Sequence, residues 1–343
     1  MRRELNPRGV AAYGPAPDGR DRREPEMDDR LQRYRQAGLK AVLFQLQYQQ
    51  PDGSFIWEQS IRDAYHKQSY SWGIAGFAPQ AHRLINWIKA NTLKPEGDLV
   101  DYRGDVYKLS WLFQGVHRLG RFDLSYPVWS WLRTQQAECG GFPHFSGDKH
   151  LRALATAWTG VSALYIGEVE LARRVGECCI SMADQQPDPG RFYFQMTGDG
   201  RLVTTEMDEG AQFIDCAKLN QPYWEASLPW MLMGRLYQVT GEERWLQQAE
   251  RYFELHLTFA EDRFANVGSG KASLAASVHY INTGDLRARD AAYTFADFLV
   301  QTQYPEGGWR GETEPDELLI YLDHAAEYNI WLHELVCRLH AMA

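Results

Sequence analysis

The chain repeats one short pattern along its length, in which an apolar helical stretch ends in an amide side chain and a tight glycine-aromatic turn follows. The clearest copy spans residues 296–309, with Gln303 before the turn and Gly307-Gly308-Trp309 in it. The other copies are Gln50 before Phe55, Gln136 before Phe142 and Gln186 before Phe192, with degenerate copies around Gly97 and Phe264. A repeat of this length is typical of an array of supersecondary units whose neighbours bury a shared core.

A second set of glycines divides each repeat into two parts. Gly120, Gly167, Gly241 and Gly284 each follow a helical stretch, and the last three directly precede an acidic residue. Glycine suits the left-handed position after a helix, and an acidic residue favours the start of the next one. The two marks therefore predict two helices in each repeat.

The predicted fold class is all-α, an (α/α)6 barrel or toroid of six helix pairs. The amphipathic outer helices are predicted at 28–50, 80–91, 123–136, 168–186, 242–259 and 285–303. The inner helices, which lack a polar face, are predicted at 66–78, 104–119, 149–166, 220–240, 269–283 and 317–340. A small β-hairpin is expected at 191–196 and 201–205, in an insertion of the fourth repeat. We expect residues 27–343 to form a single toroid domain and residues 1–26 to form an irregular arm.

Charge and composition exclude several classes of partner. The formal net charge is −9, and no basic run interleaves with aromatic residues, so nucleic acid and acidic membrane surfaces are not expected partners. No apolar run approaches the roughly 20 residues that cross a bilayer, so membrane insertion is not expected. The five cysteines form no CxxC pair, which favours a reducing compartment. We therefore expect a cytoplasmic protein whose partner is a small-molecule substrate.

The repeat resembles the Gln-Trp repeats of the terpenoid cyclase and protein prenyltransferase toroids. The resemblance covers roughly residues 28–340 and implies the architecture, in which the glutamine ties down a helix end and the aromatic residue packs over it. The catalytic motifs of these enzymes are absent: no Asp-x-Asp-Asp string occurs, the run at Asp28-Asp29 lacks the final aspartate, and Asp215 is adjacent to Cys216 rather than spaced by one residue. The resemblance therefore implies the fold and no catalytic residue.

An α/α barrel presents the N-terminal ends of its inner helices at one mouth, where free N–H groups and positive dipole ends converge. The site is therefore predicted in the first turns of the inner helices. The predicted catalytic residues are Asp105, Tyr223, Glu225, Asp323 and His324. The predicted substrate-binding residues are His66, Tyr70, Trp72, Tyr102, Arg103, Tyr107, His150, Trp224, Glu327 and Tyr328. No cofactor and no metal are expected, because Cys139, His144 and His150 match no established ligand spacing.

The sixth inner helix carries the most informative cluster. Asp323 and Glu327 are four residues apart, as are His324 and Tyr328, so each pair shares a helical face. A buried carboxylate beside a histidine or a tyrosine suits acid–base work. A purely structural network remains the alternative, and first-turn carboxylates such as Glu225 and Asp105 also stabilise a helix dipole.

Three functions remain open from the sequence. The first is a cofactor-independent cyclase or isomerase of natural-product or isoprenoid type, which uses general acid–base catalysis in an aromatic-lined cavity. The second is a carbohydrate-active enzyme, either a glycoside hydrolase or a sugar epimerase. The third is a toroid that binds without catalysis. A closed apolar chamber favours the cyclase, whereas two carboxyl groups about 5–10 Å apart beside an open groove favour the glycosidase.

Overall fold

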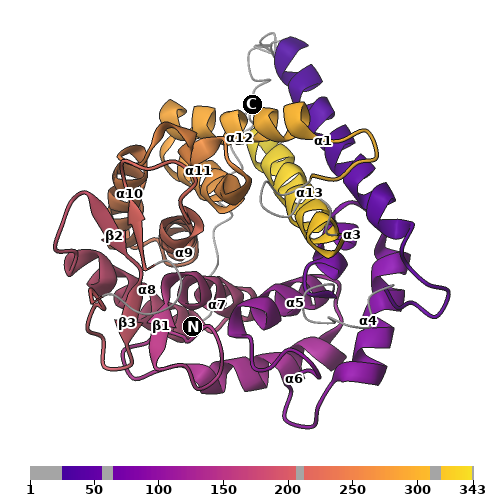
Figure 1. Ribbon diagram of the computed structural model, residues 1–343, viewed down its shortest axis with the longest axis horizontal. Helices are drawn as coiled ribbons and strands as arrows, with labels where there is room; N and C mark the ends of the chain where they lie inside the picture. Colours follow the sequence, from indigo (N-terminus) through magenta and orange to yellow (C-terminus); the bar gives the residue numbers. More distant parts are fainter. Residues whose placement is uncertain (1–24, 56–64, 206–211, 310–317, 342–343) are drawn as a thin grey trace, which may run out of the picture.

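Two concentric layers of helices form a closed ring (Figure 1), in a computed structural model that describes residues 25–55, 65–205, 212–309 and 318–341. The inner layer contains α3 (Gln68–Ile74), α5 (Val106–Arg118), α7 (Ala153–Ile166), α9 (Trp224–Thr240), α11 (Gly270–Thr283) and α13 (Leu318–Ala341). The outer layer contains α1 (Pro25–Leu46), α4 (Ala78–Thr92), α6 (Phe122–Leu132), α8 (Val169–Asp184), α10 (Glu243–Leu257) and α12 (Leu286–Thr302). The predicted (α/α)6 barrel is confirmed.

The two layers differ in composition as the sequence indicates. In α7 every residue from Ala153 to Ala163 is buried. In α10 the buried residues Trp245, Ala249, Tyr252, Phe253 and His256 follow helical spacing and form one face. The inner helices are thus surrounded on all sides, while each outer helix buries only the face that it turns toward the ring.

The boundaries differ from expectation at the first repeat. The inner helix α3 has only 7 residues, and α1 begins at Pro25, within the segment expected to be irregular. Residues 1–24, which contain the rest of the predicted arm, lie outside the described residues. None of the described helices combines the length and the apolar character that a bilayer crossing requires.

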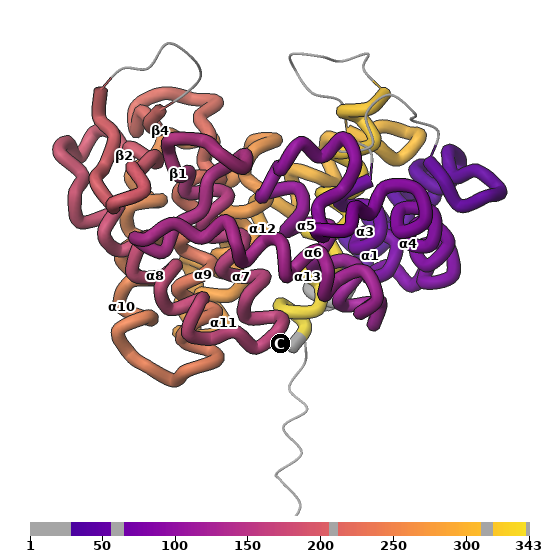
Figure 2. Tube along the Cα trace, turned by 90° about the horizontal axis from the view of Figure 1, so that it is seen from below, coloured from indigo at the N-terminus to yellow at the C-terminus, as the bar shows by residue number. Residues whose placement is uncertain are grey.

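Short strands and 3-10 turns lie between the helices, and Figure 2 shows the labelled strands near one rim of the ring. The strands are β1 (His150–Arg152), β2 (Arg191–Tyr193), β3 (Gln195–Thr197) and β4 (Phe213–Asp215), and the 3-10 turns are η1 (Arg133–Gln135), η2 (Glu261–Phe264) and η3 (Val267–Ser269). The expected hairpin is reduced to a Met196–Leu202 bridge, because β3 pairs mainly with β1 and β2 pairs with β4. Pairing β1 with β3 joins Leu151 to Met196, which are both buried, whereas Arg201 on the other arm is exposed.

The repeat glycine marks the point where neighbouring outer helices touch. A Cβ atom on Gly53 would lie 2.5 Å from the carbonyl oxygen of Arg83 in α4. A Cβ on Gly307 would lie 2.5 Å from the carbonyl oxygen of Lys40 in α1. Gly97 and Gly140 approach α6 and α8 in the same way. Each of these turns therefore rests on the backbone of the next outer helix, and the turn at Gly307 closes the ring from the last helix pair onto the first.

The repeat amide and the repeat aromatic residue hold the same turn. Gln303 donates from Nε2 to the carbonyl oxygens of Gly307 at 2.9 Å and Ala37 at 2.8 Å. Trp309 donates from Nε1 to the carbonyl oxygen of Leu299 at 2.8 Å. Gln136 likewise donates to Gly140 at 3.0 Å. The Leu299 carbonyl lies in the last turn of α12, where a backbone carbonyl lacks a partner within the helix, whereas the carbonyls of Gly307 and Gly140 belong to the turns themselves.

This close contact makes the repeat glycine sensitive to substitution. We expect Gly307→Ala to destabilise the fold by about 3 kcal/mol, because the new methyl group would meet the Lys40 carbonyl and the backbone would keep a left-handed conformation. Gly120→Ala is the matched control, since Gly120 also has a positive φ but has no atom within 4 Å of its Cβ position. The control should lose only about 1 kcal/mol. Urea unfolding measures both losses, and equal losses would show that the helix contact contributes nothing.

Candidate active site

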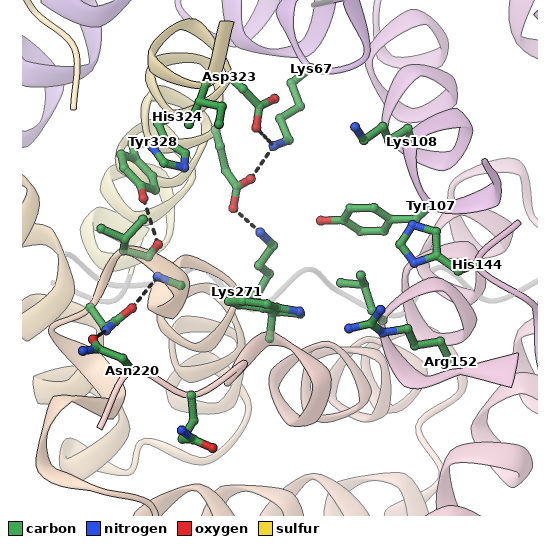
Figure 3. A pocket seen from close by; sticks show the side chains of 18 residues that line it. Lys67, Tyr107, Lys108, His144, Arg152, Asn220, Lys271, Asp323, His324 and Tyr328 are labelled. Carbon is green, nitrogen blue, oxygen red and sulfur yellow. Dashed lines mark hydrogen bonds and ion pairs between the residues drawn. The ribbon is translucent and has the colours of Figure 1, made fainter. Parts of the chain in front are cut away.

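A cavity of about 680 Å³ opens at the N-terminal ends of the inner helices (Figure 3). Its volume lies within the range of roughly 300–1,000 Å³ that is common for ligand sites. Every inner helix or the turn before it contributes to the lining. The lining residues are Lys67, Tyr107, Lys108, His144, Arg152, Leu154, Asn220, Gln221, Trp224, Asn266, Val267, Gly268, Lys271, Ile320, Asp323, His324, Glu327 and Tyr328.

A buried ion network forms the deepest wall of the cavity. The Nζ atom of Lys67 lies 2.7 Å from Asp323 Oδ2 and 2.6 Å from Glu327 Oε2. Lys271 forms a second ion pair with Glu327, which also accepts a hydrogen bond from Trp331 Nε1 at 3.2 Å. Lys67 and Glu327 are almost fully buried. The network joins the start of α3 and the start of α11 to the middle of α13.

The network is ionised at neutral pH. Burial alone would raise the pKa of Glu327, but Lys271 and Lys67 outweigh burial and hold it well below its usual range. The pKa of Asp323 is also lowered, by Lys67 and His66 against the effect of burial. Burial alone would lower the pKa of Lys67, yet the two carboxylates raise it above its ordinary value. Neither carboxyl group therefore carries a proton that it could donate.

Neutral groups occupy the walls beside and opposite this network. Burial lowers the pKa of His324, which leaves the imidazole uncharged at neutral pH. Its ring stacks on Tyr328 with centroids 5.4 Å apart, and Tyr328 donates its hydroxyl to the carbonyl oxygen of Val267. Burial raises the pKa of Tyr107 well above its ordinary value, so its phenol stays protonated. Figure 3 shows Tyr107 and His324 on opposite walls.

Six of the sequence-predicted residues line this cavity. They are Tyr107, Trp224, Asp323, His324, Glu327 and Tyr328. His66 lies behind the wall, with Nε2 3.5 Å from Asp323 Oδ1. The four positions on α13 share the cavity because their helical spacing places them on adjoining faces of one helix.

The three other predicted catalytic residues lie outside the lining. Asp105 caps α5 by accepting a hydrogen bond from the Lys108 N–H at 2.9 Å. Tyr223 is buried, and its hydroxyl donates to Asp262. Glu225 is buried behind Arg152 and accepts the Leu154 N–H, one of the free donors at the start of α7, at 2.9 Å. Burial raises the pKa of Glu225 against the opposing effect of Arg152.

The remaining predicted substrate-binding residues are also placed elsewhere. Tyr70 donates its hydroxyl to Glu334 at 2.6 Å, and Trp72 donates to Gln45 on the outer helix α1 at 3.1 Å. Tyr102 is buried in the core, and Arg103 is exposed at a positive φ of 55°. His150 pairs with Thr197 in the strand ladder.

Several lining residues were not selected from the sequence, although they lie in the same turns. Lys67, Lys108, His144, Arg152 and Lys271 are the charged or titratable ones. One signal could have marked Lys67 and Lys271. A cation at a helix N-terminus opposes the dipole, so its presence there indicates a nearby carboxylate partner.

One group of potential metal ligands lies outside the cavity. Ligand atoms of Glu250, His279 and Asp285 lie within 4.8 Å of one another. Arg287 forms ion pairs with Glu250 at 3.6 Å and with Asp285 at 2.6 Å. The chain therefore supplies its own cation to these carboxylates, and we assign no role to this group.

Comparison with known proteins shows the fold. No protein-family model matches the sequence, and no curated protein matches it. A D-mannose isomerase matches with a TM-score of 0.64 and 12% identity over 87% of this chain and 97% of its own. An α-1,6-mannanase from Salegentibacter sp. matches with a TM-score of 0.62 and 12% identity over 89% of this chain and 99% of its own. A type II terpene cyclase from Scytonema, in complex with geranylgeranyl dihydroxybenzoate, matches with a TM-score of 0.58 and 13% identity over 91% of this chain and 99% of its own.

These matches define the class of the fold, an α/α toroid. The three solved structures are an isomerase, a hydrolase and a cyclase, so the fold is shared by enzymes of different chemistry. At identities this low the likeness shows the architecture and no particular family.

The ion network makes stability depend on pH in a defined direction. A carboxyl group whose pKa is lowered by folding stabilises the protein above its unfolded pKa, about 4.3 for Glu, and loses this contribution as pH falls. Glu327→Gln should cost about 3 kcal/mol at pH 7, because Lys271 and Lys67 lose a buried counter-charge. The variant should also lose less stability than the wild type between pH 5 and pH 3.

Urea unfolding at a series of pH values measures both effects. Glu170→Gln is the matched control, because the Glu170 side chain is 83% exposed and its pair with Arg173 lies on the surface. That control should follow the wild-type curve. A Glu327→Gln curve that runs parallel to the wild type would contradict the assigned ionisation.

Proposed function

We propose that this protein is an enzyme that isomerises or epimerises a polar, hydroxylated small molecule by moving a proton within the cavity. One observation carries the proposal: a neutral imidazole, His324, shares the cavity with two buried ammonium groups and faces a protonated phenol, Tyr107. This set provides a base, an oxyanion-stabilising pair of cations and a hydrogen-bond donor.

The proposed reaction is a proton transfer next to a carbonyl group. His324 takes a proton from the carbon beside the carbonyl, the electron pair of that C–H bond forms a C=C bond, and the π pair of the carbonyl moves onto its oxygen. Lys67 and Lys271 stabilise the resulting oxyanion, and Tyr107 donates a hydrogen bond to the substrate. For epimerisation, the imidazolium returns the proton to the other face of the same carbon. For isomerisation, the proton of the neighbouring hydroxyl group moves to the former carbonyl oxygen, and the imidazolium returns its proton to the former carbonyl carbon. The reaction is internally balanced and needs no oxidant or reductant.

The carboxylates argue against hydrolysis of a glycosidic bond. A glycosidase needs one protonated carboxylic acid with a raised pKa and a second ionised carboxylate. Here Asp323 and Glu327 bind the same ammonium group of Lys67, and both pKa values are lowered. The similarity of the fold to a D-mannose isomerase agrees with isomerisation of a sugar-like compound.

A cyclase is the second candidate. Tyr107, Trp224 and Tyr328 provide aromatic surface at the cavity, and the toroid is similar to that of a terpene cyclase. Aromatic faces stabilise cations during cyclisation. The charged lining favours the polar substrate, because an apolar chain would strip water from Lys67, Lys271 and Asp323 without replacing its hydrogen bonds.

The first test is deuterium exchange with a panel of neutral aldoses and ketoses, including D-mannose and D-fructose, together with uronic acids and sugar phosphates. In D2O the wild type should place solvent deuterium at the carbon beside the carbonyl of its substrate, detected by NMR. His324→Asn should lower the exchange rate by about 100-fold or more, because the general base is lost.

The matched control is His340→Asn, since His340 is exposed near the end of the same helix. This variant should exchange at the wild-type rate. Absence of exchange with every compound, or full exchange by the His324→Asn variant, would overturn the proposed function. Conversion of a polyprenyl compound by the wild type would support the cyclase instead.

The pH dependence of kcat/KM gives a second test. Protonation of His324 inactivates the base, and burial lowers its pKa, so the acid limb of the profile should lie below the ordinary histidine value of about 6.5. The rate at pH 6.5 should therefore still exceed half of its plateau value. A limb centred above pH 7 would assign the base to another group.

A further inference from the structure

We propose that Arg152 anchors an anionic group of the substrate, which makes the substrate class a hydroxylated carboxylic acid or phosphate ester rather than a neutral sugar. This inference rests on the proposed function, because only an enzyme has a substrate. The binding of the anion itself can be measured without turnover.

A buried carboxyl group holds the side chain of Arg152 in place. Its Nε atom donates to Glu225 Oε1 at 2.7 Å. Glu225 is fully buried and also accepts hydrogen bonds from the Leu154 N–H at 2.9 Å and from Trp224 Nε1 at 3.2 Å. A carboxylate with three donors has little freedom to move. The guanidinium of Arg152 is therefore fixed along one edge before any ligand binds.

The opposite edge of the same guanidinium is open to the cavity. Within the described part of the chain, the two terminal nitrogens of Arg152 have no hydrogen-bond partner, and the side chain is 29% exposed and lines the cavity. These nitrogens form a planar fork that matches two oxygens of a carboxylate or a phosphate. A fixed donor pair loses little conformational entropy when it binds such a group.

The side chains that line the cavity carry more positive than negative charge. Lys67, Lys108, Arg152 and Lys271 line it, against Asp323 and Glu327, so cationic side chains outnumber carboxylates in the lining. Glu225 offsets one positive charge from behind the wall. The whole chain carries a net charge of −9, so this excess of positive charge is local. A cavity of this kind concentrates anions.

Arg152 lies across the cavity from the groups that carry the proposed chemistry. Arg152 directly precedes α7. Figure 3 shows Arg152 on the wall with Tyr107 and His144, across the cavity from Asp323 and His324. An anion on Arg152 would therefore leave the far end of the ligand facing His324 and the ion network.

A purely structural role for Arg152 makes a different prediction from an anchoring role. If Arg152 served only to neutralise Glu225, a lysine would keep the ion pair and ligand binding would not change. If its outer edge binds the ligand, Arg152→Lys keeps the charge beside Glu225 but loses the planar fork. This substitution separates the two roles.

The test is isothermal titration calorimetry with D-glucuronate, D-glucose 6-phosphate and D-glucose as probes. The wild type should bind at least one of the two anions about 10-fold or more tightly than D-glucose. Arg152→Lys should weaken binding of that anion about 10-fold and leave the D-glucose signal unchanged. Preference for glucuronate identifies a carboxylate ligand, and preference for the phosphate ester identifies a phosphate ligand. No preference for either anion, or equal anion binding by Arg152→Lys, would overturn the inference.

Two variants keep the test decisive. Arg201→Lys is the matched control, because the Arg201 side chain is 77% exposed outside the cavity, and it should bind like the wild type. If Arg152→Lys does not fold, the double variant Arg152→Gln with Glu225→Gln removes both charges and keeps polar groups at both positions. It should lose the preference for the anion, and retention of the preference would overturn the inference.

The outcome is independent of the proposed function. Anion binding that depends on Arg152, without deuterium exchange, would retain this inference and remove the isomerase proposal. Deuterium exchange with neutral sugars at a rate that Arg152→Lys does not change would retain the isomerase and remove the anionic substrate.

Discussion

The geometry of the ring depends on how closely each repeat turn approaches the next outer helix. Where a glycine hydrogen lies against a backbone carbonyl, as at Gly53 and Gly307, any side chain would push the neighbouring helix pairs apart. Four such spacings, at Gly53, Gly97, Gly140 and Gly307, lie around a closed ring, so an error at one of them cannot be absorbed at an open end. The last turn rests on α1 through Gly307 and Gln303, and this contact converts a row of helix pairs into a barrel. Closure then brings six helix N-termini to one mouth, where the cavity lies.

The ion network is an expensive way to stabilise a barrel. Removing Lys67, Glu327 and Lys271 from water costs several kcal/mol for each ion, and an apolar cluster of the same volume often serves stability as well or better. The network does connect α3, α11 and α13. Other contacts already join those helices, since Asn329 on α13 donates to the Ser71 carbonyl oxygen of α3 at 2.7 Å and Trp331 on α13 lies against Gly270 of α11. Charges placed where the cavity reaches them are therefore better explained by a ligand than by the fold, and this supports the proposed site.

The sequence predicted the architecture well because the fold is periodic. Amide, glycine and aromatic residues recur together at four of the turns, and helical spacing separates the inner layer from the outer one. The same regularity placed Asp323, His324, Glu327 and Tyr328 together, since positions three and four apart on one helix stay together whatever surrounds the helix.

Residues at helix starts were harder to place. A carboxylate there can turn back to a backbone N–H or reach across to another helix, and both options compete with the cavity. Asp105 takes the first option and Glu225 takes the second. Tyr70 and Trp72 lie on different faces of the 7-residue helix α3. Tyr70 therefore reaches Glu334, and Trp72 reaches Gln45. Such choices are set by tertiary contacts, which a single sequence does not display.

The protonation states restrict what the cavity can do. The buried carboxylates are ionised, and Lys67 holds its proton more firmly than a lysine in water, so these groups stabilise charge and do not exchange protons near neutral pH. Tyr107 also retains its proton. His324 is left as a group that can accept a proton at neutral pH and return it, and in the proposed reaction the ammonium groups nearby favour negative charge on the substrate. An enolate or enediolate is the intermediate that such surroundings stabilise best, which is why proton transfer beside a carbonyl fits this site better than formation of a carbocation.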